Sequence, residues 1–180
     1  MKYIFIIYFS ILLFSCNTEK RKIELLIIQW SEKEIKFPNT INIKQDSLWK
    51  SLTSKEFKIL TIVDSNSCTE CRLKLHEWGK YIKETDSINT SIAFIFIVNT
   101  KDYAIVETLK KKNKFSLPIF HDYENKMDKL NLFPKDPNYQ TFLLNKENKV
   151  ILIGNPIGNL PLWKLYKKVL SEALSTKKSS

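Results

Sequence analysis

Residues 58–73 read KILTIVDSNSCTECRL. Residues 58–63 are a compact apolar run, as expected for a strand buried on both faces of a sheet. Residues 64–67 (DSNS) have the composition of a turn, and Cys68 then opens an amphipathic stretch. This sequence predicts a central strand, a tight turn and a helix that begins at Cys68. The buried stripe of that helix is expected to comprise Leu73, Leu75, Trp78, Tyr81 and Ile82.

Downstream of this stretch, apolar runs typical of strands alternate with amphipathic segments typical of helices. The strand-like runs are residues 92–98, 117–120, 141–144 and 150–153. The helix-like segments are residues 102–113, 125–132 and 160–174. The turn-rich residues 145–148 indicate a hairpin between the last two strands. Because alternating strands and helices favour a parallel sheet covered on both faces, and a hairpin adds antiparallel strands, we expect an α/β fold with a central mixed sheet flanked by helices.

An N-terminal extension precedes the central strand. Residues 23–30 carry apolar side chains at helical spacing and predict a helix. Residues 34–37 alternate and stop at Pro38, which predicts a short edge strand. Residues 40–44 alternate again and are expected to pair with that strand. We therefore expect an N-terminal helix and a β extension in front of the α/β core.

The first residues have the features of an export signal. Residues 3–14 are almost wholly apolar, and this run is shorter than a bilayer-spanning helix requires. It ends in Leu13-Phe14-Ser15-Cys16, which resembles the bacterial lipobox, in which the signal is cut before the cysteine and the sulfur receives a lipid. The alternative is a short core helix with a chance cysteine. The extreme N-terminal position and the polar residues 17–22 that follow argue against it.

This interpretation divides the chain and places it in the cell. The expected parts are a signal peptide (1–15), the acylated Cys16 with a polar tether (16–22), one folded domain (23–174) and a polar tail (175–180). The expected location is the cell envelope, with the chain bound to membrane lipid through Cys16 and facing the periplasm, at the outer or the inner membrane. The two or three acyl chains of a lipoprotein hold stably. A dithiol can persist oxidised in such a compartment.

The charge of the chain does not indicate a nucleic-acid partner. The formal net charge is +10, and of 29 basic residues only Arg21 and Arg72 are arginines. Because bidentate recognition of bases and phosphates favours arginine, we expect no nucleic-acid binding.

Cys68-Thr69-Glu70-Cys71 is the motif that carries chemistry. Residues three apart at a helix start lie one turn apart, close enough for a disulfide, and the unpaired backbone N–H groups there stabilise a thiolate. Once Cys16 is acylated, these are the remaining two of the three cysteines. Glu70 is expected to oppose thiolate formation and thus to tune the redox poise, with Arg72 and Lys74 within a turn to offset it.

Several segments together resemble one protein family. They are residues 34–38, residues 67–73 with Trp78, and residues 117–120, 140–145 and 150–156. In these segments the chain is similar to extracytoplasmic thioredoxin-like lipoproteins of the Bacteroidetes type, which are related in fold to cytochrome-maturation thiol reductases. The resemblance implies a thioredoxin-like fold and thiol–disulfide exchange, in which Cys68 attacks and Cys71 resolves. It also implies protein thiols or disulfides as partners, and we expect no cofactor.

The chain departs from that family at three positions. Thioredoxins usually carry Trp before the first cysteine, where this chain has Ser67. They often bury an acidic residue six positions before that cysteine, where this chain has Ile62. They place a cis-proline three residues before the Phe of the Thr-Phe-Leu strand, where it receives substrate backbone. This chain has Tyr139 there, which makes Tyr139 the candidate substrate-binding residue.

The predicted function is a membrane-anchored thiol–disulfide oxidoreductase, a reductant or low-potential exchanger. One alternative is a non-catalytic binding module that keeps the disulfide as a staple, although so short a loop is a poor stabiliser. The other is a Cys₂His₂ zinc site with His76 and His121. Cys71 and His76 are five residues apart, a poor fit to one helical face, and we expect no metal.

Overall fold

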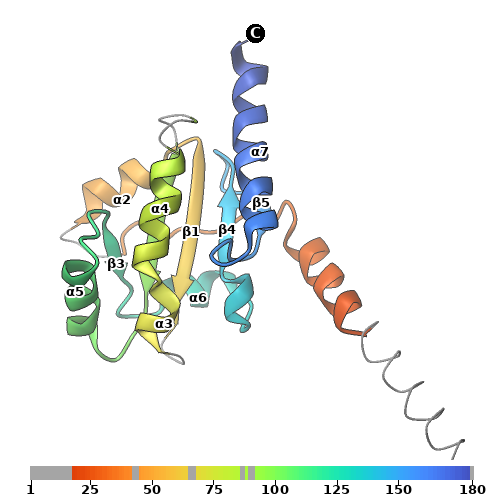
Figure 1. Ribbon diagram of the computed structural model, residues 1–180. Coiled ribbons are helices and arrows are strands. Elements are labelled where there is room, and N and C mark those ends of the chain that lie inside the picture. The colour runs from red at the N-terminus through yellow and green to blue at the C-terminus, as the bar shows by residue number, and fades with distance from the viewer. Residues whose placement is uncertain (1–17, 42–44, 65–67, 86–87, 89–91, 179–180) are drawn as a thin grey trace, which may run out of the picture.

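The computed structural model describes residues 18–41, 45–64, 68–85, 88 and 92–178. Its strands are β1 (Phe57–Val63), β2 (Ile92–Val98), β3 (Ile119–His121), β4 (Thr141–Leu144) and β5 (Val150–Ile153). A helix over residues 18–30 comes first (Figure 1). The helices after it are α2 (Asp46–Thr53), α3 (Thr69–Leu73), α4 (Leu75–Thr85), α5 (Tyr103–Lys112), α6 (Lys126–Asn131) and α7 (Leu160–Lys178), with a 3₁₀ turn η2 (Pro137–Tyr139).

The strands form one mixed sheet in the order β3-β2-β1-β4-β5. β1 pairs in parallel with β2 and antiparallel with β4, β2 pairs in parallel with β3, and β4 pairs antiparallel with β5. All seven residues of β1 are buried, because it has a neighbouring strand on each side and helices on both faces. The predicted α/β class, with a central mixed sheet flanked by helices, is confirmed.

Two hydrophobic cores lie between the sheet and the helices that cover its two faces. The α4 core contains Trp78 of α4 and Trp163 of α7, and the α2 core on the other face contains Trp49 of α2 and Trp30. Each tryptophan is at most 2 % exposed and anchors a different helix. Successive side chains of a strand point to opposite faces of the sheet. Neighbouring residues of β1 and β2 therefore contribute alternately to one core and the other. The three layers can be followed in Figure 1.

The segment before β1 differs from its prediction. Residues 18–22, expected as part of a tether, belong to the helix over 18–30. Residues 34–37 do not form a strand: Glu34 makes a single bridge with Lys149. The reason is Asn131 of α6, whose side chain takes both backbone groups of Lys36, accepting from its N–H at 2.8 Å and donating to its carbonyl at 2.9 Å. A partner strand would need those same groups.

Two further predictions for this part of the chain lie partly or wholly outside the described residues. Of the predicted strand 40–44, residues 40 and 41 are not in a strand and residues 42–44 lie outside the described part. The lipobox and Cys16 also lie outside it. Of the helices that are described, none is long and apolar enough to span a membrane.

α2 was not predicted. Asp46 and Lys50 form an ion pair at 2.7 Å on its exposed face, while Trp49 turns inward and donates its Nε1–H to the carbonyl of Pro38 at 2.9 Å. This helix covers the α2 core through Trp49.

The helix predicted from Cys68 is broken into α3 and α4 at Lys74, whose φ is 41°. Leu73 and Leu75 are both buried, at 0 % and 3 % exposure. Residues two apart point to different sides of a continuous helix, so both could not face the α4 core without a break. The left-handed residue between them resolves the conflict, and Trp78 N–H then donates to Lys74 O at 3.1 Å as the helix resumes.

Lys58 is a fully buried cation in β1. Its Nζ donates to the carbonyls of Lys55 at 2.9 Å and Lys146 at 3.2 Å. Burial lowers the pKa of Lys58 to about 8, and the nearby Glu147 and Glu56 only partly oppose this. The ammonium group therefore carries a desolvation cost at neutral pH.

We expect the stability conferred by Lys58 to rise above pH 8. Between pH 8 and 10.5 the folded state has lost the proton and the unfolded state still binds it, so the free energy of unfolding rises with pH, by up to roughly 3 kcal/mol. Urea unfolding of the wild type and Lys58→Met from pH 7 to 10 measures the difference. Lys129→Met on the exposed face of α6 is the control. Parallel profiles for the wild type and Lys58→Met would contradict the expectation.

Candidate active site

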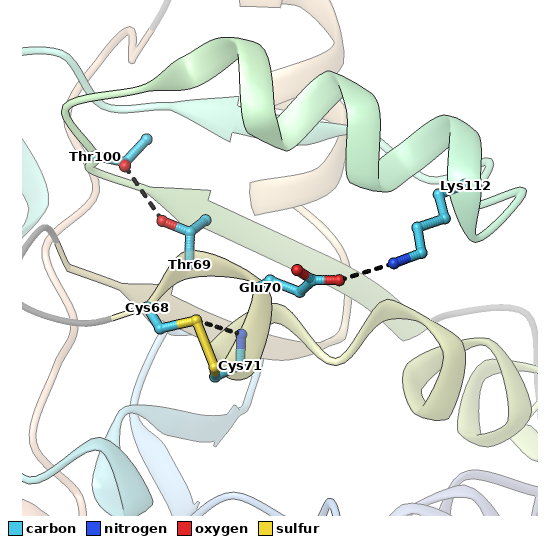
Figure 2. Close-up of a disulfide and its surroundings, with 6 residues drawn as sticks. All are labelled: Cys68, Thr69, Glu70, Cys71, Thr100 and Lys112. Carbon is cyan, nitrogen blue, oxygen red and sulfur yellow. Dashed lines mark hydrogen bonds and ion pairs between the residues drawn. A yellow bond between two sulfur atoms is a disulfide. The ribbon is translucent and has the colours of Figure 1, made fainter.

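Cys68 and Cys71 form a disulfide at the start of α3, with their Cα atoms 5.3 Å apart (Figure 2). Cys68 is the N-cap residue of α3, and its Sγ accepts the backbone N–H of Cys71 at 3.2 Å. This hydrogen bond satisfies one of the amides that a helix start leaves unpaired. A negative charge on the Cys68 sulfur would strengthen it.

Both cysteines are exposed. The buried side of α3 is formed by Thr69 and Leu73, four residues apart. Cys68 and Cys71 are three apart and share the outward side. The disulfide is therefore open to a partner from solvent.

A hydroxyl contact holds the first turn of α3 to the sheet. Thr69 Oγ1 lies 3.2 Å from Thr100 Oγ1, in the loop that follows β2 (Figure 2). Thr69 is 8 % exposed, and the contact is partly buried. It fixes the cysteine turn relative to the carboxyl end of β2.

Glu70 forms an ion pair with Lys112 at the end of α5, at 3.1 Å (Figure 2). Both side chains are more than half exposed. The cation beside Glu70 thus comes from α5, whereas Arg72 and Lys74 were expected to provide it. The carboxylate stays close to the dithiol with its charge largely balanced.

Arg72 instead belongs to a polar network under the other side of the dithiol. Its guanidinium donates to Gln140 Oε1 at 2.5 Å, and Gln140 Nε2 donates to Asp64 Oδ2 at 3.0 Å and to Pro134 O at 2.8 Å. Burial lowers the pKa of Arg72, while Asp64 and Asp136 raise it. The network ties the end of β1, α3 and the segment before β4 together.

Sequence reasoning missed this network. Gln140 is 3 % exposed and lies 68 residues from Arg72 and 76 from Asp64. A short-range motif cannot indicate a contact over such separations. The single hint was a glutamine directly before an apolar strand, where an unpaired amide would be costly.

Tyr139, the candidate substrate-binding residue, ends η2 and is partly buried against the α2 core. Its N–H donates to the carbonyl of Asp136 at 3.0 Å. Burial raises the pKa of Tyr139, and Asp136 and Glu19 add to the rise. The described part of the chain contains no cis peptide bond, consistent with the absence of proline at this position. A role in binding substrate stays a prediction.

The described residues do not form the zinc site that was considered as an alternative. In the described ranges, no three His, Cys, Asp or Glu side chains are gathered so that they could hold a metal ion. His76 lies exposed on α4, whereas His121 at the end of β3 packs against Tyr103 and Tyr123. Burial lowers the pKa of His121. The two histidines are therefore not brought together with the cysteines.

No protein-family model matches the sequence, and no curated protein matches it. Solved structures do match the fold. The thioredoxin domain of a thiol-disulfide oxidoreductase from Bacteroides vulgatus is 10 % identical over 66 % of this chain and 81 % of that one, with a TM-score of 0.50. The chain has a thioredoxin-like fold.

Two further structures give the same result. A candidate protein disulfide isomerase from Bacteroides thetaiotaomicron is 20 % identical, covering 67 % of this chain and 75 % of its own, with a TM-score of 0.50. A candidate thiol:disulfide interchange protein DsbE from Chlorobium tepidum is 14 % identical, covering 66 % and 84 %, also with a TM-score of 0.50. At these identities the likeness concerns the fold.

We expect Glu70 and Lys112 to shift the redox potential of the dithiol in opposite directions. Glu70→Gln removes a charge that opposes the thiolate and should make the couple more oxidising, whereas Lys112→Gln leaves Glu70 unbalanced and should make it less oxidising. Each shift should be at most ~30 mV, equivalent to 1.4 kcal/mol for two electrons. Equilibration against glutathione buffers measures both, with Lys111→Gln as the control. Shifts of the same sign would contradict the expectation.

Proposed function

We propose that the chain is a thiol–disulfide oxidoreductase that acts on protein disulfides, as a reductant or low-potential exchanger. The observation that carries the proposal is the exposed Cys68–Cys71 pair at the start of α3, on a thioredoxin-like fold. The hydrogen bond from the Cys71 N–H to the Cys68 sulfur supports Cys68 as the attacking residue.

The reaction begins from the reduced dithiol. The Cys68 thiolate attacks one sulfur of a partner disulfide, forms a mixed disulfide and releases the other partner sulfur as a thiolate, which takes a proton from solvent. The Cys71 thiolate then attacks the Cys68 sulfur, which forms the Cys68–Cys71 disulfide and releases the second partner thiol. Two electrons pass to the partner. A second, external dithiol protein returns them and restores the reduced state.

Two features favour a reactive disulfide over a structural staple. The bond joins cysteines with a sequence separation of 3, and so short a loop restricts little of the unfolded chain. Both cysteines are also exposed, so a partner thiol can reach the bond.

The charges around the site favour a modest potential. Strong disulfide oxidants owe their potential to a strongly stabilised thiolate. Here Lys112 is balanced by Glu70. Arg72 is held by Gln140 on the other side. Neither cation is therefore fully available to the Cys68 sulfur, in keeping with a reductant or low-potential exchanger.

Replacing the resolving cysteine should trap the partner. We expect reduced Cys71→Ala to form a mixed disulfide with insulin, a generic protein disulfide, that persists until dithiothreitol is added, because no second thiol can displace it. Non-reducing gel electrophoresis and mass spectrometry detect the adduct. Cys68→Ala is the matched control and should trap at least tenfold less. Equal trapping by the two variants would overturn the assignment of roles, and no adduct with either would favour the structural disulfide.

We further propose that the domain is anchored in the cell envelope by lipid on Cys16. Support comes from the apolar residues 3–14 that end in Leu13-Phe14-Ser15-Cys16. With two or three acyl chains the anchor would be stable, and it would hold the dithiol in a compartment where disulfides persist.

Cys16→Ser should prevent processing and acylation. In a bacterial host fed a labelled fatty acid, we expect the wild type to be cleaved before Cys16 and labelled, since the lipoprotein peptidase acts on the lipid-modified cysteine. The variant should remain uncleaved and unlabelled. Cys68→Ser is the control and should be processed like the wild type. Equal labelling of Cys16→Ser would refute the proposal.

A further inference from the structure

We propose that a groove leading away from Cys71 along α4 binds an acidic, partly apolar segment of the partner polypeptide, next to the partner's reacting cysteine. This inference rests on the proposed function and adds to it the chemistry of the partner. Glu70, which lines the groove beside Cys71, is paired with Lys112 (Figure 2).

Two adjoining cavities make up the groove. The first, of about 370 Å³, is lined by Cys71 itself and by residues on both sides of the break at Lys74. The second, of about 430 Å³, continues along α4 as far as Lys83. Leu75, His76 and Asn113 line both, so the two cavities adjoin. A partner attached to the dithiol would thus find an open path beside it.

The floor of the groove is apolar. Leu73, Leu75 and Leu109 line the first cavity, and Phe115 and Ile82 line the second. The first four belong to the α4 core, at 8 % exposure or less, and Ile82 packs against that core from its rim. The floor is therefore rigid and can accept apolar side chains without rearrangement.

The rim of the groove is basic. Lys74 lines the first cavity, and Lys80, Lys83 and Lys114 line the second, all of them exposed. The acidic residues on the same rim are Glu70, already paired with Lys112, and Glu77. This excess of positive charge complements an acidic partner and disfavours a basic one.

The length of the groove suits a short extended segment. From Leu75 to Lys83, α4 rises about 12 Å at 1.5 Å per residue. An extended chain covers this with about four residues. The partner segment that matters is therefore the four or so residues flanking its cysteine.

The opposite side of the dithiol is less available. Tyr139 and Gln140 use their N–H groups within η2, donating to the carbonyls of Asp136 at 3.0 Å and Pro137 at 3.3 Å. The side chain of Gln140 is bonded to Arg72. A partner backbone arriving there would have to replace these hydrogen bonds, whereas the groove along α4 needs only to lose water.

Two disulfide-linked peptide dimers test the proposal. In each, a single cysteine is flanked on both sides by four residues, alternating Leu with Glu in the acidic peptide and Leu with Lys in the basic one. We expect the reduced wild type to reduce the acidic dimer at least tenfold faster at low salt, with the advantage shrinking as salt screens the charges. An acidic dimer with Ser in place of Leu should react more slowly, because the floor is apolar.

Charge reversal identifies the groove as the source of the preference. Lys80→Glu, Lys83→Glu and Lys114→Glu combined should remove or invert it. The matched control combines Lys129→Glu, Lys146→Glu and Lys164→Glu, which change the net charge equally on other surfaces and should preserve it. If the groove variant does not fold, single Lys80→Gln and Lys83→Gln replacements should each weaken the preference.

The outcomes separate this proposal from the function on which it rests. Bis(2-hydroxyethyl) disulfide, which is small and neutral, reports the intrinsic exchange of the dithiol. Suppose that this small disulfide is reduced while the acidic and basic peptides react at equal rates, or that the two triple variants lose the preference equally. The groove proposal is then wrong, and the proposed function stands. If neither bis(2-hydroxyethyl) disulfide nor any of the peptide dimers is reduced, the proposed function itself fails.

Discussion

The complete burial of β1 is the constraint on which the rest of the structure depends. The strand is hydrogen-bonded on both sides and covered on both faces, and even Lys58 within it is removed from water. At its end, Ile62 N–H donates to Gln140 O at 2.9 Å and Val63 O accepts from Asn99 N–H at 2.8 Å. The segments before β4 and after β2 are thereby drawn to the same sheet edge. The cysteines follow where the chain leaves this edge, so the position of the dithiol is a consequence of how β1 is buried.

The break between α3 and α4 shows how core packing shapes the surface of the site. Leu73 and Leu75 both enter the α4 core, which a continuous helix would not allow. The left-handed conformation of Lys74 costs about 1 kcal/mol or more for a non-glycine residue, whereas burying a leucine gains roughly 2 kcal/mol. The gain from burying both leucines therefore outweighs the cost of the left-handed residue. As a result, α3 is short and presents both cysteines outward, and a hollow lies at the break.

The parts of the fold that could be predicted are those encoded locally. The runs 58–63 and 92–98 are apolar throughout because both of their faces are buried, and the cysteine motif directly follows the first. The failures involve distant partners. Residues 34–37 alternate like a strand, yet Asn131 occupies both backbone groups of Lys36. Glu70 finds its cation on α5, and Gln140 joins Arg72 across 68 residues. In each case the deciding contact is absent from the local sequence.

The replacement of proline by Tyr139 has a physical consequence for recognition. A proline has no N–H, whereas Tyr139 has one and uses it to close η2 onto Asp136. Each hydrogen bond of this kind is worth about 1 kcal/mol net. The segment before β4 is thus stabilised by its own hydrogen bonds and by Gln140. Because its backbone groups are already paired, it would gain little free energy from hydrogen bonds to a partner chain. The groove along α4 has the opposite character, because its exposed lysines lie at a rim where a partner can meet them. On the groove proposal, the turn that contains Tyr139 therefore contributes less to binding a partner than the groove along α4.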